Sequence, residues 1–302
     1  MRTVALISPG DMGQAVGALL TRGGERVVTC VAGRSDRTRA LARAAGFIEV
    51  PSLDALVRES ELLLSIVPPA HAVAVARDVA AALSAARARL TYVDCNAIAP
   101  RTAREVAAVI APTGSGFVDV GIVGGPPRDA PSPRFYASGP DRARFGALRD
   151  AGLDVRLLGE EVGEASAVKM CYAALTKGTT AIATELLVAA RKLGVYDTLV
   201  AELRDSQATQ AKRMGDAVPA MPGKAHRWIA EMEEIARTFE DVGLTPLIFQ
   251  GAAEMYRLTA GSEIGGERPE TVDHFRGVDG TVEVLARASE KVPTANDKVP
   301  TK

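Results

Sequence analysis

The sequence predicts an α/β protein, in which a Rossmann-type, doubly wound parallel sheet is followed by an all-α C-terminal domain. Up to about residue 158, short apolar runs alternate with segments of helical period, as in a parallel sheet flanked by helices. After Gly163 the strand-like runs end and only helical patterns follow. A chain of 302 residues exceeds what one core usually organises. We therefore expect two domains, residues 1–162 and 163–290.

The individual elements follow from the period of the apolar residues. Strands are expected at 3–8, 27–32, 62–67, 90–94, 116–120 and 151–157. Helices between them are expected at 12–22, 36–45, 52–59, 70–84 and 100–110, and in the second domain at 164–193, 197–214, 224–242, 246–259 and 281–290. Ser52 and Asp36 are the expected N-caps of two of these helices. Residues 291–302 are polar and without periodicity, and we expect a disordered tail there.

Composition excludes several classes of protein. The net charge is −1, with 36 basic and 37 acidic residues, so no basic field favours nucleic acid. Apolar runs such as 62–67 are much shorter than the roughly 20 residues that cross a bilayer, and the N-terminus has no signal-peptide pattern. We expect a cytoplasmic protein without a membrane partner. Cys30, Cys95 and Cys171 lack metal-ligand spacing and are expected to be buried, reduced thiols, with no metal site.

A glycine-containing loop joins the first expected strand to the first helix. It reads Ser8-Pro9-Gly10-Asp11-Met12-Gly13 and fills the G-x-G-x-x-G pattern with serine in the first slot. Gly10 would let the backbone approach a pyrophosphate, and Gly13 would let the helix pack on the sheet. Since the turn need not demand positive φ at Ser8, we expect Ser8, Gly10, Asp11, Met12 and Gly13 to bind a dinucleotide. The alternative is a turn with coincidental glycines.

The segment after the second strand predicts which dinucleotide is bound. It reads Gly33-Arg34-Ser35-Asp36-Arg37-Thr38 and lacks the acid that binds the adenosine ribose of NAD. The guanidinium groups of Arg34 and Arg37 and the hydroxyl of Ser35 suit a 2′-phosphate instead. These residues predict NADP(H) as the cofactor. The alternative is a solvated helix start.

Five segments in order carry a resemblance to a known family. They are residues 8–13, Ser65-Ile66-Val67-Pro68-Pro69, Asp94-Cys95-Asn96-Ala97-Ile98-Ala99-Pro100, Asp119-Val120-Gly121-Ile122-Val123-Gly124-Gly125, and Gly163-Glu164-Ala165-Ser166-Ala167-Val168-Lys169. With them the chain resembles the β-hydroxyacid dehydrogenases, relatives of 6-phosphogluconate and 3-hydroxyisobutyrate dehydrogenases. Within that family it is similar to a branch whose C-terminal domain resembles that of phosphogluconate dehydrogenase and has no known function. The resemblance covers about residues 1–190.

The resemblance implies roles for residues at the strand ends. Val67 and Pro68 end a strand where doubly wound folds bind ligands, and they are expected to contact the cofactor. The amide of Asn96 would bond the nicotinamide carboxamide or the substrate, although an asparagine after a strand is often only a turn former. Gly124 and Gly125 offer backbone N–H groups to a carboxylate or phosphate of the substrate. The family usually has serine just before that pair.

This chain has Val123 in the serine slot, which suggests a less polar substrate. Lys169 matches the family's catalytic lysine and is flanked by Val168 and Met170. Desolvation in such a setting lowers a lysine pKa, and the amine would then act as general acid and base. The alternative is a lysine that extends its ammonium from a helix face into solvent.

Other expected substrate contacts lie farther along the chain. The family carries an asparagine one turn after the lysine, whereas here Tyr172, at i+3 from Lys169, would supply a hydroxyl. Lys177, at i+8, is a second candidate for binding an anion. Arg227 and Trp228 are candidates for the substrate pocket, although the simpler interpretation of the spacing of Trp228 with later residues is a packing stripe.

Taken together, these observations predict a homodimeric NADPH-dependent dehydrogenase or reductase. It would interconvert a small hydroxy compound, bearing an anionic group, with its carbonyl form. An imine reductase or an oxidative decarboxylase on the same scaffold is the enzymatic alternative, although imine reductases commonly replace the lysine. A non-catalytic NADP-binding sensor or scaffold is the other alternative.

Overall fold

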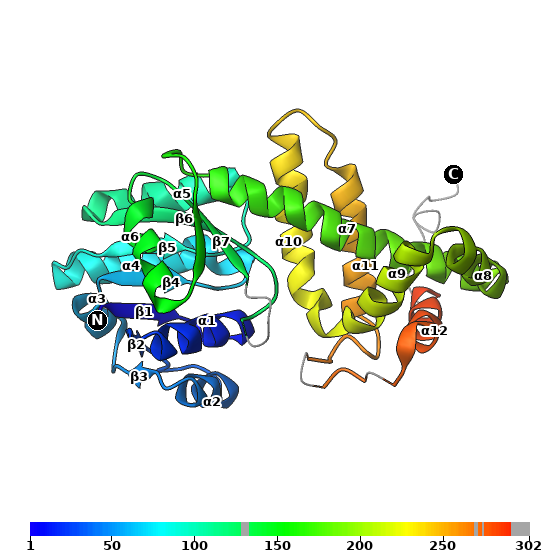
Figure 1. The fold of residues 1–302 in the computed structure, drawn as a ribbon, viewed down its shortest axis with the longest axis horizontal. Helices are drawn as coiled ribbons and strands as arrows, with labels where there is room; N and C mark the ends of the chain where they lie inside the picture. The colour runs from blue at the N-terminus through cyan, green and yellow to red at the C-terminus, as the bar shows by residue number, and fades with distance from the viewer. Residues whose placement is uncertain (128–132, 269–270, 274, 291–302) are drawn as a thin grey trace, which may run out of the picture. The chain divides into compact units, whose positions relative to one another are not determined.

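The computed structural model describes residues 1–127, 133–268, 271–273 and 275–290 (Figure 1). It divides into two compact units, Met1–Tyr172 and Ala173–Lys302. The first contains a sheet with its helices, and the described part of the second is helical. The α/β class, with a Rossmann-type sheet before a helical region, is thereby confirmed. The functional boundary expected after residue 162 stays a prediction, and the expected tail lies outside the described residues.

In the described part of the first unit, the sheet has eight strands in the order β3-β2-β1-β4-β5-β6-β7-β8. All neighbours pair parallel except β6 and β7. The strands are β1 Thr3–Ile7, β2 Arg26–Thr29, β3 Ile48–Glu49, β4 Leu62–Ser65, β5 Thr91–Asp94, β6 Gly116–Val123, β7 Arg134–Ser138 and β8 Asp154–Leu157. The carboxyl ends of β1 to β6 therefore meet at one edge of the sheet.

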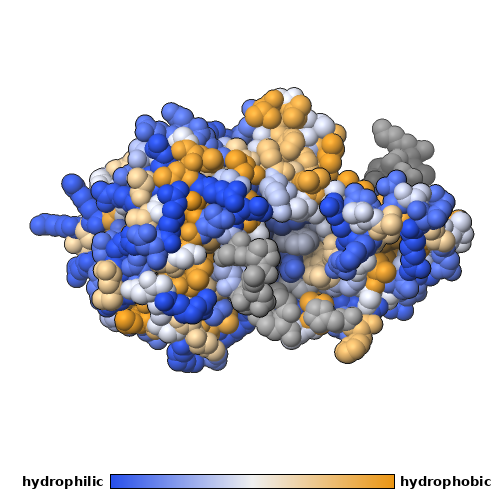
Figure 2. Space-filling model, in the orientation of Figure 1, coloured by the Kyte–Doolittle hydropathy of each residue, from blue (hydrophilic) through white to orange (hydrophobic). Residues whose placement is uncertain are grey.

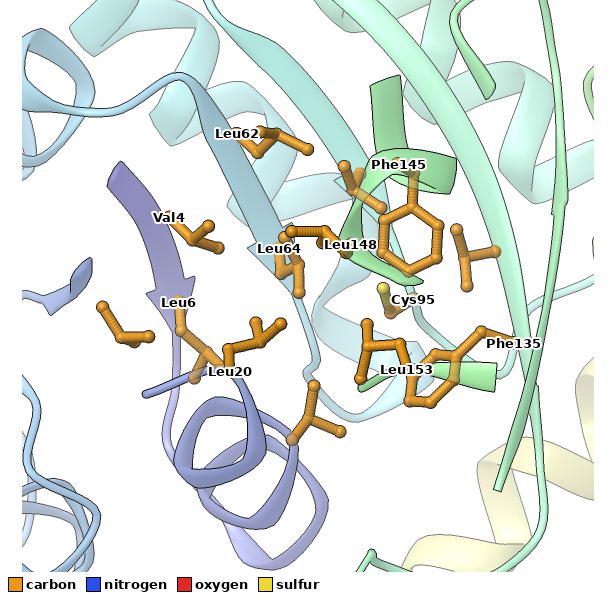
Figure 3. Packing of buried hydrophobic residues seen from close by; sticks show 14 of the residues in the cluster. Val4, Leu6, Leu20, Leu62, Leu64, Cys95, Phe135, Phe145, Leu148 and Leu153 are labelled. Carbon is orange, nitrogen blue, oxygen red and sulfur yellow. The ribbon is translucent and has the colours of Figure 1, made fainter. Parts of the chain in front are cut away.

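Alternating strand residues build one apolar layer on each face of the sheet. On one face, Val4, Leu6 and Leu64 pack with Leu20 of helix α1 (Asp11–Arg22) and with Phe145 (Figure 3). Ala5, Leu63 and Tyr92 belong to the layer on the other face. Among the described residues of this unit, six α-helices accompany the sheet: α1 Asp11–Arg22, α2 Asp36–Ala44, α3 Leu53–Glu59, α4 Ala72–Ala86, α5 Pro100–Ile110 and α6 Arg142–Gly146. Burying each leucine of these layers contributes roughly 1.5–3 kcal/mol.

Six further helices follow in the described residues. They are α7 Glu164–Lys192, which begins in the first unit, α8 Tyr196–Ser206, α9 Ala208–Ala220, α10 Pro222–Glu240, α11 Leu247–Ala260 and α12 Gly277–Ser289. Helices α10 and α11 pack through aromatic pairs, with ring centroids 5.2 Å apart for Trp228 and Tyr256 and 4.6 Å apart for Phe239 and Phe249. No helix among the described residues is both long and apolar enough to span a bilayer.

Several element predictions need correction. Strands β3 and β7 and helix α6 were not expected, because each is five residues or shorter and such runs carry little periodicity. The strand expected at 151–157 begins only at Asp154, since a 3₁₀ turn ends at Gly152 with φ +93°. The helix expected at 197–214 is two helices, separated at Gln207, whose φ of −133° is not helical.

Two side-chain predictions are also wrong. The N-cap of α2 is Ser35 rather than Asp36, because the Ser35 hydroxyl accepts a hydrogen bond from the backbone N–H of Thr38 at 3.3 Å. Cys95 is buried, but Cys30 is only half-buried and Cys171 is exposed. Cys171 shares the outer face of α7 with Tyr172, whereas the next two residues face inward. All three cysteines are free thiols.

Candidate functional site at the carboxyl edge of the sheet

The predicted site residues of the first unit follow the strands whose carboxyl ends share one edge. One row of the register runs across the sheet through Ile7, Ser65, Asp94 and Asp119. The loop 8–13 follows this row on β1, and loops likewise follow it directly on β4 and β5, whereas β6 continues to Val123 before its loop begins. Open α/β sheets bind ligands at this edge.

The loop after β1 makes a tighter turn than the sequence suggested. Ser8 has φ +61°, in the left-handed region, which corrects the expectation that no positive φ was needed; a non-glycine residue there costs about 1–2 kcal/mol. The backbone N–H of Gly10 donates to the Ser8 carbonyl at 2.6 Å. A Cβ on Gly13 would lie 3.0 Å from that carbonyl oxygen and 3.2 Å from Leu6 Cδ2. Gly13 therefore allows the close approach of α1 to the sheet.

Gly10 has a different environment. Among the residues that the structure describes, a Cβ there would meet no atom closer than the Ser8 carbonyl oxygen at 3.9 Å, so the packing of these residues does not require glycine. Gly10 is also the N-cap of α1 and provides no side-chain cap. Asp11 and Met12 are half-buried in the first turn, and Met12 packs against the core. The start of α1 thus leaves space beside Gly10 at the positive end of the helix.

The residues expected to select the cofactor surround the start of α2. Arg34 and Ser35 are exposed, and Arg37 and Thr38 are half-buried. The hydroxyls of Ser35 and Thr38 lie 3.1 Å apart, so the cap and the predicted 2′-phosphate ligands belong to the same turn. Their role in binding stays a prediction.

Asn96 connects the loops that follow β4 and β5. Its Oδ1 accepts the backbone N–H of Val67 at 2.7 Å, and its Nδ2 donates to Asp94 Oδ2 at 2.9 Å and to Ser65 Oγ at 3.2 Å. Both amide hydrogens are therefore used inside the protein. Asn96 is buried and holds the Val67-Pro68 loop in place, so a ligand bond from Nδ2 would have to replace one of these contacts.

Asp94 supports this connection from β5. It also accepts the backbone N–H of Asn96 at 2.9 Å. Burial raises the pKa of Asp94 to about 7; the hydrogen bonds from Asn96 oppose that rise, and the neighbouring Asp119 carboxylate adds to it. No role for Asp94 itself was predicted from the sequence.

Lys169 reaches the same edge from α7. Its Nζ donates to the carbonyl oxygen of Ile122, near the end of β6, at 2.5 Å. The side chain is half-buried, and the neighbouring residues Ala165 and Met170 are fully buried. Burial lowers the pKa of Lys169 to about 8. The neutral amine that proton transfer requires is therefore populated at a lower pH than in an ordinary lysine.

A buried carboxylate that sequence reasoning missed lies beside the start of α7. Asp119, on β6, accepts hydrogen bonds from the backbone N–H groups of Gly163 and Ser166 at 3.0 and 2.9 Å. Burial raises its pKa, and these bonds, with those from the hydroxyls of Ser166 and Ser138, oppose the rise. The signal in the sequence was one acid within the otherwise apolar run 117–123.

The glycine pair after β6 is exposed. Gly124 has φ +127°, and a Cβ there would lie 3.0 Å from Pro133 Cα, whereas a Cβ on Gly125 would meet no atom of the described residues within 4 Å. Val123, in the slot where serine was expected, is buried. The backbone beside Gly125 is thus open.

The remaining predicted substrate residues lie on α7 and in the second unit. Tyr172 is exposed on the outer face of α7. In the second unit, Lys177 forms an ion pair with Glu231 and lies 5.6 Å from the centroid of the Trp228 ring. Glu231 thus competes with the anion that Lys177 was expected to bind. Arg227 and Trp228 are half-buried, and Trp228 packs as the alternative interpretation expected.

Metal ligation has no support among the residues that the structure describes. Within those residues, no group of three or more His, Cys, Asp or Glu side chains could hold a metal ion.

Comparison with known proteins agrees with this arrangement. The family model for the NAD binding domain of 6-phosphogluconate dehydrogenase matches residues 3–149, and that for a domain of unknown function, DUF1932, matches residues 190–259. An uncharacterized 28.5 kDa protein in the 7S RNA 5′ region of Methanothermus fervidus is 28% identical over 235 residues, covering 76% of this chain and 88% of that protein.

Two solved structures extend the comparison. The conserved protein MTH1747, of unknown function and described as structurally similar to 3-hydroxyacid dehydrogenases, is 30% identical with a TM-score of 0.63, covering 85% of this chain and 98% of that one. The 3-hydroxyisobutyrate dehydrogenase of Mycobacterium tuberculosis, solved with L-serine, is 22% identical with a TM-score of 0.67, covering 91% and 99%. At that identity it shows a shared fold.

Proposed function

The chain belongs to the family that carries the NAD binding domain of 6-phosphogluconate dehydrogenase, here followed by a domain of unknown function, and from that premise we propose that it is an NADP(H)-dependent oxidoreductase. The family resemblance drawn from the motifs is thereby confirmed. The proposed reaction interconverts a small hydroxy compound and its carbonyl form. The observation that carries this proposal is Lys169, an amine of lowered pKa at the carboxyl edge of a dinucleotide-binding sheet.

The dinucleotide fits the loop after β1. The backbone beside Gly10 is open, so a pyrophosphate has space against the N-terminus of α1. The Val67-Pro68 loop, held by Asn96, follows the adjacent strand β4 and would line the same site. Arg34, with Arg37 and Ser35, would bind the 2′-phosphate that distinguishes NADP from NAD.

Lys169 supplies the proton chemistry. NADP⁺ bound at this edge would supply the hydride acceptor. During oxidation, neutral Lys169 Nζ takes the hydroxyl proton while the carbon–hydrogen bond of the substrate breaks, and the carbonyl forms. In the reverse direction the ammonium donates that proton to the developing alkoxide. The exposed N–H groups beside Gly124 and Gly125 would bind an anionic group of the substrate.

The assembly that we propose is a homodimer. At the end of the second unit where α10 is followed by α11, Val242, Leu244, Leu247 and Ile248 are 57–70% exposed, and the space-filling view shows apolar colour over this end (Figure 2). A symmetric contact would cover this surface.

A substrate screen tests the function. NADPH consumption is followed with a panel of aldehydes, keto acids and cyclic imines, with the Lys169→Ala variant as the control for non-enzymatic oxidation. We expect turnover of a carbonyl compound by the wild type alone. Turnover of imines only, or NADPH binding without turnover of any member, would favour the imine reductase or the sensor instead.

A further inference from the structure

The start of helix α7, which carries Lys169, is bound by a single buried side chain of strand β6. Both Asp119 oxygens accept hydrogen bonds: Oδ1 from Ser166 Oγ at 2.6 Å, and Oδ2 from the N–H groups of Gly163 and Ser166 at 3.0 and 2.9 Å and from Ser138 Oγ at 3.2 Å. A buried carboxylate is stable only with such donors. The negative charge also lies at the positive end of α7.

Two residues farther along β6, the backbone approaches α7 very closely. A Cβ on Gly121 would lie 2.5 Å from the carbonyl oxygen of Ala165 and 3.0 Å from Lys169 Cβ. Backbone atoms cannot rotate away as a flexible side chain can, so any other residue at position 121 would force α7 and β6 apart. The next residue, Ile122, provides the carbonyl that accepts Lys169 Nζ.

Strand β6 therefore contacts α7 in three ways within four residues. Asp119 binds the first turn, Gly121 allows the close approach, and Ile122 accepts the lysine. We propose that Asp119 and Gly121 are positioning residues for Lys169, which hold α7 at the distance from β6 where Nζ stays on the Ile122 carbonyl and away from water. That Lys169, once positioned, transfers a proton rests on the proposed function; that Asp119 and Gly121 position it does not.

Displacing α7 has a consequence that an ordinary packing defect elsewhere lacks. If α7 moves outward, Lys169 Nζ loses the Ile122 carbonyl and gains water. Since burial is what lowers the pKa of Lys169 to about 8, hydration returns it toward the ordinary value of 10.5. The titration of Lys169 thus reports how closely α7 lies on β6.

The experiment is a titration of the full chain with ¹³Cε-labelled lysine, followed by NMR. The sequence has eight lysines, and the Lys169 signal is identified by its absence from Lys169→Arg. We expect wild-type Lys169 to titrate near pH 8 and Gly121→Ala to titrate at least one pH unit higher. The matched control is Gly251→Ala on α11, where a Cβ meets no atom within 4 Å, and it should titrate as the wild type does.

A second variant applies if Gly121→Ala does not fold. Asp119→Asn keeps the shape of the side chain, but its N–H₂ group faces some of the hydrogen-bond donors that the carboxylate accepts from. The control is Asp154→Asn, at an exposed position of β8. We expect the Lys169 pKa to rise and the amides of Gly163 and Ser166 to exchange at least about tenfold faster. A folded Gly121→Ala or Asp119→Asn protein with unchanged Lys169 titration would overturn the proposal.

These measurements need no substrate, so they are independent of the proposed reaction. If Lys169→Ala kept full turnover, the proposed function would fail while the titration result stood. If turnover depends on Lys169 but the pKa of Lys169 is unchanged in the Asp119 and Gly121 variants, only the positioning proposal fails.

Discussion

Replacing Lys169 by methionine should stabilise the folded protein at neutral pH while abolishing proton transfer. A shift in pKa from 10.5 to about 8 means that holding the charged amine in the fold costs up to about 3 kcal/mol. The side chain is half-buried, so solvent screening reduces this cost. Methionine also leaves the Ile122 carbonyl without its donor, which costs about 1 kcal/mol or more. The expected net gain is about 1–2 kcal/mol.

The direction in which the stability gain of Lys169→Met changes with pH shows whether desolvation of the charged amine causes it. For a base whose pKa is lowered by folding, the cost is present in full below the folded pKa of about 8. It declines as pH rises toward the unfolded value of 10.5, above which both states hold a neutral amine. The advantage of Lys169→Met should therefore be greatest at pH 7 and should shrink by pH 10.

The assay is urea unfolding at both pH values, followed by circular dichroism and tryptophan fluorescence. Trp228 is the only tryptophan in the chain and belongs to the second unit, so comparing the two signals distinguishes the transitions of the two units. Lys212→Met, at an exposed lysine of α9, is the matched control and should not show this pH dependence. If Lys169→Met is no more stable than the wild type at pH 7, or if its advantage does not change with pH, the desolvation argument is wrong.

Three other outcomes follow from the structure. NADPH should bind at least about tenfold tighter than NADH, about 1.4 kcal/mol, and fluorescence titration should show Arg34→Ala losing that preference; equal affinities for the wild type would contradict the assignment. Asn96→Ala should cost about 2–3 kcal/mol in thermal unfolding, since it leaves the Val67 N–H without its acceptor and removes the side-chain donor to Asp94 Oδ2, and an unchanged melting temperature would refute the connecting role. Light scattering should show a dimer at micromolar concentration that Leu247→Glu converts to monomer, whereas a wild-type monomer would exclude the proposed contact.

The order of the main elements could be predicted because it depends on local patterns. Apolar runs such as 62–67 and the helical period at 100–110 predicted β4 and α5 from nearby residues alone. Strand β7 could not be predicted in this way. Its five residues become a strand by pairing antiparallel with β6, and that tertiary contact leaves little signal in so short a run.

In the candidate site, too, features carried by local sequence motifs could be predicted, and features that depend on distant contacts could not. The glycine loop and Lys169 were visible because each lies in a short motif with a recognisable context. The role of Asp119 was not visible, since the two backbone groups that it binds are 44 and 47 residues away. Likewise, the positive φ of Ser8 follows from how the loop closes on itself, and the serine side chain alone gives no sign of it.

The most direct test of the central claim, that Lys169 moves the proton, is turnover at saturating substrate and NADPH for wild type, Lys169→Ala and Lys169→Arg. We expect both variants to bind NADPH with unchanged affinity and to lose at least about a hundredfold in kcat, the scale of a general acid or base, because a guanidinium does not deprotonate near neutral pH. Circular dichroism confirms that each variant is folded. A raised KM with kcat intact would assign Lys169 to substrate binding, and wild-type kcat in either variant would contradict the mechanism.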